Sequence, residues 1–176
     1  MANINKNSVS LAGEFAVLSQ LALRGYDANM TLGHTKNVDI LVSDPKTNKM
    51  YQLEVKTNNY RKDFDKCIKS KIFGKYLSDW IMDEKHEIIS RPELFYCFVG
   101  ISKKTDAFRY FIVPSMVVSK YVKDEHKYWQ EIKKKEGAKV KLDTGMRLFR
   151  IGFEKEKYDI DTPTIERYEN NWSFKK

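Results

Sequence analysis

Cysteine, histidine and proline are scarce in this sequence, and long apolar runs are absent. The 176 residues include two Cys, three His and four Pro. Two cysteines cannot form the disulfide framework of a small secreted protein, so we expect free thiols in a reducing, cytoplasmic setting. Three scattered histidines and two distant cysteines also argue against a zinc site of the usual ligand spacing.

Membrane-spanning and modular architectures are disfavoured as well. No apolar run approaches the roughly 18 residues of a membrane helix, and the polar start M-A-N-I-N-K does not resemble a signal peptide. No internal repeat, low-complexity tract or linker divides the chain. We therefore expect one domain over residues 1–176 with a core of its own and no contact with a membrane.

Positive charge and aromatic side chains are what the sequence has in abundance. Lys and Arg number 32 against 24 Asp and Glu, which gives a net charge of +8, and aromatic residues make up 13% of the chain. This aromatic content argues against disorder. A basic chain favours a polyanionic partner, although charge describes association rather than fold.

Residues 37–56 form the most informative stretch. They read N-V-D-I-L-V-S, then D-P-K-T-N-K, then M-Y-Q-L-E-V-K, which is two runs of alternating apolar and polar residues around a polar turn. This pattern predicts an antiparallel β-hairpin. With the turn centred on the polar segment, Asp39 falls opposite Glu54, about 5 Å away. Lys56 lies on the same strand face as Glu54 because side chains alternate with period two.

The predicted hairpin places two carboxylates and one ammonium together. Two carboxylates at this distance repel each other, and partial burial makes it costly to ionise both. A divalent cation such as Mg²⁺ removes the conflict, because it prefers hard oxygen ligands. The alternative is an ordinary hairpin with a surface ion pair, since an isolated D…ExK pattern is common on strands.

The same residues carry a resemblance to a known superfamily. Asp39 followed by Glu54-Val55-Lys56 resembles the core motif of the PD-(D/E)xK nucleases, and most of all their Holliday-junction-resolvase-like and restriction-endonuclease-like branch. In that branch an N-terminal helix carries a glutamate, and Gly13-Glu14-Phe15-Ala16 matches it. The resemblance covers about residues 8–114 and departs at Val38, where the family has proline.

The resemblance implies a divalent-metal-dependent endonuclease that hydrolyses DNA phosphodiester bonds as a homodimer, without an organic cofactor. Asp39, Glu54 and the backbone carbonyl of Val55 would hold Mg²⁺ or Mn²⁺, and Lys56 would position the attacking water. Glu14 would help to hold a second ion, or is simply a solvated glutamate at the helix edge. The alternative function is a nucleic-acid-binding or assembly module that keeps the nuclease fold without catalysis.

Four more residues flank the predicted site in polar segments. A basic or imidazole side chain in such a position can contact a backbone phosphate. An exposed loop residue without a function is the alternative for each of them. These candidates for nucleic-acid binding are His34, Lys36, Arg61 and Lys62.

The remaining pattern predicts an α/β fold with a central mixed β-sheet of about five strands, flanked by helices, and a C-terminal helical extension. We expect the helix of Glu14 on one face of the sheet and the helix that starts at Met116 on the other. Besides the hairpin, strands are expected over residues 26–31, 94–101, 108–113 and 147–151. Helices are expected over residues 8–24, 116–135 and 161–172 and, after a loop, within 67–82. The first of them presents an apolar stripe of Leu11, Phe15, Leu18 and Ala22, which Val17, Leu21 and the neighbouring alanines widen.

Overall fold

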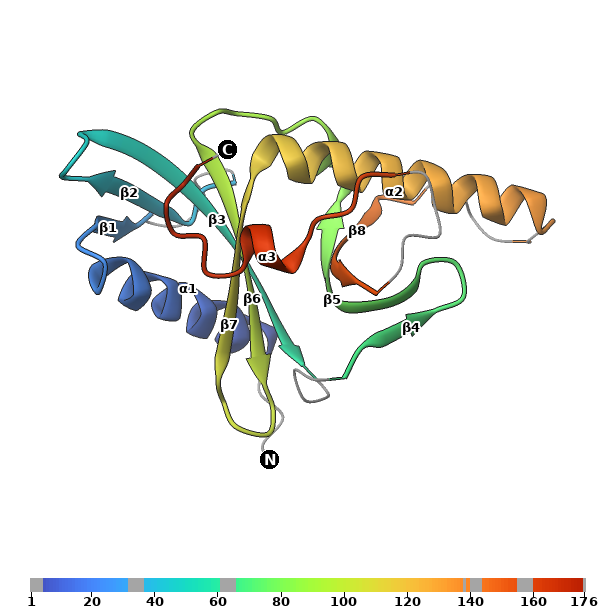
Figure 1. Cartoon of the computed structure of the whole chain (residues 1–176), viewed down its shortest axis with the longest axis horizontal. Coiled ribbons are helices and arrows are strands. Elements are labelled where there is room, and N and C mark those ends of the chain that lie inside the picture. The colour runs from blue at the N-terminus through green and yellow to red at the C-terminus, as the bar shows by residue number, and fades with distance from the viewer. Residues whose placement is uncertain are drawn as a thin grey trace.

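The central hairpin and its flanking elements form an α/β fold (Figure 1). The computed structural model of the protein describes residues 5–31, 37–60, 66–137, 139, 144–154 and 160–175. In chain order the elements are α1 (Lys6–Ala22), β1 (Asp27–Met30), β2 (Ile40–Asp44), β3 (Lys49–Tyr60), β4 (Ile68–Ser70), β5 (Gly74–Asp83), the 3₁₀ helix η1 (Glu84–Glu87), β6 (Leu94–Ser102), β7 (Phe108–Pro114), α2 (Ser115–Lys135), β8 (Met146–Phe153) and α3 (Ile165–Tyr168).

Two sheets organise these strands. The larger sheet is mixed and has the order β1-β2-β3-β6-β7, in which β3 and β6 run parallel and the other neighbours run antiparallel. The smaller sheet is antiparallel and has the order β4-β5-β8. Every residue of β6 is buried, as expected for a strand with both faces covered. The predicted mixed sheet of five strands is confirmed, and the second sheet is an addition to it.

The alternation of side chains along β3 divides the core into two layers. Leu53 and Val55 belong to the apolar cluster that contains Val17 and Leu21 of α1. Glu54 is paired with Tyr96, which belongs to the opposite cluster beneath α2 and the second sheet. The two predicted helices therefore cover opposite faces of the central sheet, as expected.

Two hydrogen bonds join the second sheet to the first. The indole Nε1 of Trp80 donates to the carbonyl of Val99 at 3.0 Å, and Nδ2 of Asn58 donates to the carbonyl of Asp79 at 2.8 Å. Since both acceptors are backbone atoms, these bonds fix the position of β5 relative to β3 and β6 rather than only that of a side chain. The second sheet is thus held directly beside the C-terminal half of β3.

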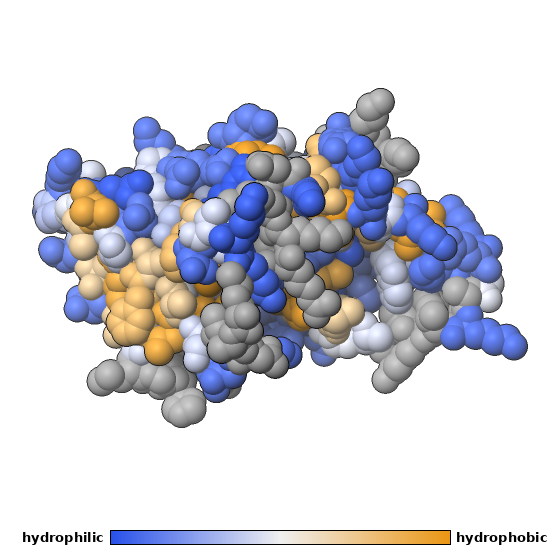
Figure 2. All heavy atoms as spheres, turned by 90° about the horizontal axis from the view of Figure 1, so that it is seen from below, coloured by the Kyte–Doolittle hydropathy of each residue, from blue (hydrophilic) through white to orange (hydrophobic). Residues whose placement is uncertain are grey.

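Helix α1 packs on the sheet through one edge of its predicted apolar stripe, formed by Val17 and Leu21, rather than through the centre of the stripe. Leu11 and Phe15 are 46% and 57% exposed, and the buried residues are Gly13, Val17 and Leu21. Figure 2 shows apolar side chains gathered on the end of the molecule that carries α1. The reason is the close approach at Gly13, where an added Cβ would clash with Oγ1 of Thr57 in β3. Backbone contact at a glycine overrides the larger apolar area of the neighbouring face.

The helix predicted within residues 67–82 is wrong, because β4 and β5 occupy this segment. Apolar residues four positions apart lie on one face of a helix, but they also lie on one face of a strand. The strand pairs with β8, about 70 positions later, and this partner cannot be seen in the local pattern. The chain turns at Gly74, whose φ is 68°. Alternate residues of β5 are buried, namely Tyr76, Ser78, Trp80 and Met82.

Most of the other predicted elements are confirmed, and the last one is shorter than predicted. The helix near the C-terminus, α3, ends at Tyr168, because Glu169 is extended and forms an isolated β-bridge with Phe111 of β7. Trp172 and Phe174 are nevertheless buried and dock this segment against the first core layer. Both cysteines are free, and Cys97 is buried as expected. Within the described ranges, no helix is long and apolar enough to cross a membrane.

The contact at Gly13 gives a stability prediction. Gly13→Ala should lower the free energy of unfolding by about 1–3 kcal/mol, because the added methyl group forces α1 away from β3. Urea unfolding followed by circular dichroism measures the change. Gly145→Ala is the control, since a Cβ at Gly145 has nothing within 4 Å. A Gly13→Ala protein as stable as the control protein would contradict this account of the helix packing.

Candidate active site at the fork between two strands

The candidate site lies where β2 and β3 separate. Ile40 is the first residue of β2 and pairs with Leu53, and Asp39 directly precedes it. The backbone N–H of Asp39 donates to the carbonyl of Leu53 at 2.7 Å. The backbone N–H of Val55 donates to Oδ2 of Asp39, also at 2.7 Å. Asp39 is thus hydrogen-bonded to the residues on both sides of Glu54. This confirms the predicted register, in which Asp39 lies opposite Glu54.

Glu54 is a charged side chain in an almost closed environment. The residue is 3% exposed. Its Oε1 lies 2.5 Å from Nζ of Lys56, and the Lys56 side chain is 29% exposed. Its Oε2 is buried and has no hydrogen-bond partner among the described residues. A buried carboxylate oxygen without a partner is costly, so this atom is available to a ligand.

Asp39 and Glu14 both have pKa values raised above the ordinary range of their side chains. Burial raises the pKa of Asp39; the Val55 N–H opposes this shift, and the charge of Glu54 adds to it. Burial likewise raises the pKa of Glu14, and the charge of Asp39 raises it further. A hydrogen bond of 3.2 Å from the Ser10 hydroxyl to Oε1 of Glu14 acts in the opposite direction. Asp39 therefore interacts electrostatically with a carboxylate on either side of it.

Behind Glu54 lies a buried pair that the sequence did not indicate. The Nδ1 atom of His86 is 2.7 Å from the hydroxyl of Tyr96, and its Nε2 atom is 3.8 Å from Oε1 of Glu54. Burial, together with the nearby charges of Lys56 and Lys85, lowers the pKa of His86 to about 4. Burial and the charge of Glu54 raise the pKa of Tyr96 far above its ordinary value. Both groups are thus neutral at pH 7.

The Tyr96 hydroxyl and Nδ1 of His86 share one hydrogen bond, whose direction depends on which ring nitrogen of His86 carries the proton. The other ring nitrogen, Nε2, is the one that faces Glu54. No motif could have identified either residue from the sequence. His86 lies in the short helix η1, and Tyr96 reaches Glu54 only through the parallel pairing of β3 with β6.

The structure brings together Asp39, Glu54, Val55 and Lys56, and it places Glu14 next to Asp39 from the side of α1. Within the part of the chain that the structure describes, no three acidic, histidine or cysteine side chains form a group close enough to hold a metal ion. The predicted phosphate contacts His34, Lys36, Arg61 and Lys62 lie outside the described residues. Their roles stay predictions, as do the catalytic and metal-binding roles of Glu14, Asp39, Glu54, Val55 and Lys56.

Hard oxygen donors dominate the fork. Asp39 and Glu54 contribute carboxylates, and the carbonyl of Val55 points to the same edge as its N–H, which faces Asp39. Such donors suit Mg²⁺ or Mn²⁺ rather than a soft metal. A divalent cation would bind the unpartnered oxygen of Glu54 and would also relieve the repulsion between the carboxylates of Asp39 and Glu54. The residues present therefore fit such an ion.

Comparisons with known proteins add little to this description. No protein-family model matches the chain, and no curated protein is significantly similar to it. Among solved structures, a bacterial homing endonuclease, I-Ssp6803I, is similar with a TM-score of 0.46 and 11% sequence identity, over 97% of this chain and 92% of that chain. A likeness of this size carries no argument about function, which is instead argued from the geometry of the fork.

The buried imidazole gives a prediction about pH. The ring-proton signals of His86 should titrate with a midpoint of about 4 in NMR spectra, because burial and two lysine charges disfavour its protonation. Lys56→Gln should raise this midpoint by removing one of the charges. A midpoint above 6 in the wild-type protein would contradict the buried neutral pair.

The same shift has a consequence for stability. The unfolded chain protonates histidine near pH 6.5, whereas folded His86 resists protonation until about pH 4. Stability conferred by neutral His86 is therefore present above pH 6.5 and is lost as the pH falls towards 4. The raised pKa values of Asp39 and Glu14 act in the opposite direction, so the test is the difference between wild-type and His86→Gln unfolding curves across this range.

Proposed function

We propose that the protein is a divalent-metal-dependent endonuclease that hydrolyses phosphodiester bonds in DNA. The observation that supports this most directly is the meeting of Asp39, Glu54 and Lys56 at the strand fork, with the buried Oε2 of Glu54 left without a partner among the described residues. This conclusion agrees with the resemblance to PD-(D/E)xK nucleases, membership of which is part of the proposal.

Asp39, Glu54 and the carbonyl of Val55 would hold one Mg²⁺ or Mn²⁺, and Glu14 would assist at a second ion. When bound, the cation supplies a Lewis acid that stabilises negative charge at the scissile phosphate and makes a water more acidic. Asp39 is held in place for this role by the N–H of Val55. Glu54 is held by its burial beside Tyr96 and His86.

Lys56 has the position of a group that acts on the nucleophile. Its ammonium lies against Glu54 but remains partly exposed, so it faces both the carboxylate and the solvent side of the fork. From there it orients the attacking water and offsets negative charge as the P–O bond forms and the O3′ or O5′ leaving group departs. Removing the amine leaves the oxygen donors in place, which separates the role of Lys56 from that of the carboxylates.

The substrate follows from charge. A net charge of +8 favours a polyanion, and affinity for DNA would come mainly from phosphate contacts. We extend the proposal to a single domain over residues 1–176 and to a homodimer, in which two sites would cut two strands. The phosphate contacts proposed near the site are His34, Lys36, Arg61 and Lys62.

One observation favours a second candidate, a nucleic-acid-binding module without catalysis. The close contact between Lys56 and Glu54 is also what a purely structural ion pair would form. An ion pair of this kind leaves Oε2 of Glu54 unsatisfied and leaves Asp39 beside a second carboxylate. The nuclease proposal accounts for both features, and the alternative accounts for neither.

Cleavage assays test the proposal. Glu54→Ala and Lys56→Ala should each reduce Mg²⁺- or Mn²⁺-dependent cleavage of DNA by at least about a hundredfold, while DNA binding is largely kept. The substrates are linear duplex, single strand, flap and four-way junction. Glu166→Ala and Lys123→Ala, at exposed positions, are the matched controls. Undiminished cleavage by the Glu54→Ala protein would refute the assignment, and binding without any cleavage by the wild type would support the non-catalytic module.

Metal binding can be tested without activity. Mg²⁺ or Mn²⁺ at about 100 times its dissociation constant should stabilise the fold by about 2.7 kcal/mol, because it binds the native state only. The thermal midpoint of the wild-type protein should therefore rise by several degrees. Asp39→Asn should abolish this rise and Glu166→Gln should keep it. An equal rise in all three proteins would place the ion elsewhere.

A further inference from the structure

A basic hairpin next to the candidate site has no evident structural purpose. Residues 66–75 contain Lys66, Lys69, Lys71 and Lys75 and no acidic residue. We call this segment the lysine hairpin; it comprises β4, the turn after it and the start of β5. All four lysines are exposed.

The charges of the lysine hairpin are poorly compensated. Lys69 pairs directly with Lys75 across the two strands, and like charges in this position destabilise a hairpin. Lys75 has an acidic partner, since its Nζ lies 2.8 Å from Oε2 of Glu154. No ion pair joins Lys66, Lys69 or Lys71 to an acidic side chain within the described ranges. The fold therefore keeps the positive charges of Lys66, Lys69 and Lys71 close together. Their mutual repulsion costs stability, and an anionic ligand would offset this cost.

The hairpin is nevertheless built as a fixed element. The hydroxyl of Ser70 accepts hydrogen bonds from the backbone N–H groups of Ile72 and Phe73, at 3.3 and 3.1 Å. Phe73 is 1% exposed and packs against Tyr128 of α2. The guanidinium of Arg150 lies over the Phe73 ring, 4.4 Å from its centroid. An anchored turn presents its lysines in a defined direction, which a merely solubilising surface does not need.

The lysine hairpin also lies within reach of a substrate held at the fork. Asn58 is two residues beyond Lys56 on β3, and it is hydrogen-bonded to Asp79, four residues beyond Lys75 on β5. The two residues from Lys56 to Asn58 and the four from Asp79 back to Lys75 together span about 20 Å, at about 3.3 Å per residue. One turn of B-form DNA is about 34 Å long. A duplex whose scissile phosphate lies beside Lys56 would therefore pass the hairpin within one turn.

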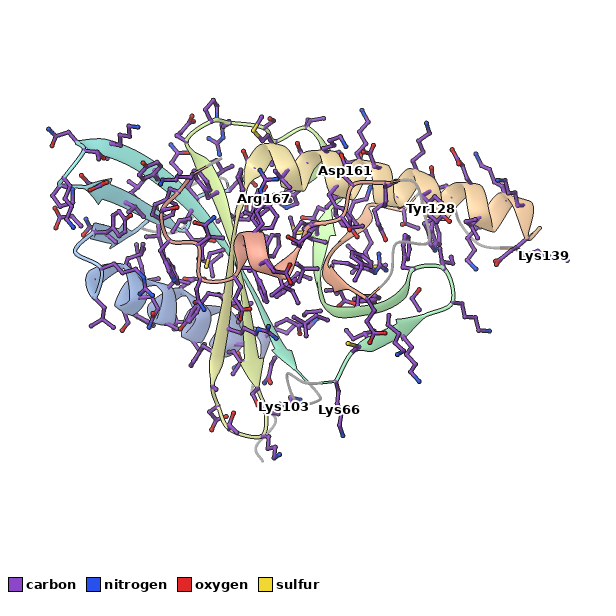
Figure 3. The ribbon with its side chains drawn as sticks, viewed as in Figure 1. Lys66, Lys103, Tyr128, Lys139, Asp161 and Arg167 are labelled. Atoms are coloured by element: carbon purple, nitrogen blue, oxygen red, sulfur yellow. The ribbon has the colours of Figure 1, made fainter. Side chains whose placement is uncertain are left out.

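Other basic side chains extend the same surface. Lys103 follows directly after β6, whose last residue, Ser102, pairs with Tyr60 at the end of β3. Figure 3 shows Lys66 and Lys103 at the same lower end of the molecule. Seen from below, the part of the molecule that carries β4 and α2 is largely hydrophilic, unlike the apolar end over α1 (Figure 2).

The geometry points to the lysine hairpin as a clamp on the nucleic-acid backbone, which contacts substrate phosphates less than one duplex turn from the scissile bond. This inference rests on the proposed function for the position of the scissile phosphate. The contact itself requires only a polyanionic backbone and no base recognition, so it would provide affinity without sequence preference.

The experiment compares two hairpins of the same chain. Lys69→Gln/Lys71→Gln removes two charges from the lysine hairpin. Lys46→Gln/Lys49→Gln removes two exposed charges from the hairpin of β2 and β3, one in its turn and one at the first residue of β3, at the opposite end of the molecule (Figure 1). Binding of a fluorescent 30-base-pair duplex is measured by anisotropy over a series of salt concentrations. The Glu54→Ala background prevents cleavage.

Loss of two phosphate contacts should reduce the slope of log K against log salt by about 1.8, at about 0.9 per contact. We expect this reduction for the lysine-hairpin variant only, and a wild-type slope for the control variant. Lys69→Arg/Lys71→Arg keeps both charges and should restore the slope, which separates a lost contact from a misfolded hairpin. Equal slopes for the two glutamine variants, or no restoration by arginine, would overturn the inference.

The salt dependence of DNA binding tests the lysine hairpin independently of catalysis. A wild-type protein that never cleaves DNA but shows the hairpin-specific change in slope would refute the nuclease and keep the clamp. A protein that cleaves DNA but binds it with the same slope in both variants would refute the clamp and keep the nuclease.

Discussion

The structure depends on one side-chain-to-backbone hydrogen bond, from the N–H of Val55 to Oδ2 of Asp39. It continues the pairing of β2 with β3 for one step beyond the point where the two backbones separate. Without it, Asp39 would be a free carboxylate at a strand end, and its position relative to Glu54 would not be defined. With it, a carboxylate from β2 is fixed beside a buried carboxylate of β3.

The residues around this hydrogen bond explain why the carboxylate of Glu54 is difficult to stabilise by protein groups alone. Glu54 projects into the layer of Tyr96, α2 and the second sheet, where Lys56 forms an ion pair with Oε1 and Nε2 of His86 lies 3.8 Å from the same oxygen. The second oxygen has no hydrogen-bond partner among the described residues, and the neighbouring His86 and Tyr96 are both uncharged at pH 7, so neither supplies a compensating positive charge. A buried charge that is half satisfied costs stability. Proteins keep such groups where they serve a function.

The second sheet gives the site its setting. The bonds from Trp80 and Asn58 to backbone carbonyls bring β5 to the C-terminal half of β3, and the buried ion pair between Arg150 and Glu125 joins β8 to α2. One side of the fork is thereby closed by packed elements. The basic hairpin that begins β5 lies towards the C-terminal end of β3.

The sequence by itself determined the hairpin, its register and the face that Glu54 and Lys56 share, because period-two alternation and turn chemistry are local properties. It also determined the mixed sheet and the helices on its two faces. Only the tertiary structure decided the strand identity of β5, since a spacing of four residues fits both a helix and a strand, and its partner β8 lies far along the chain. The tertiary structure also decided which face of α1 is buried, because the close backbone approach at Gly13 selects it. It likewise brought His86 and Tyr96 to Glu54, through the pairing of β3 with β6. Contacts of this kind have no signature in a local pattern, because they arise only when distant segments pack together.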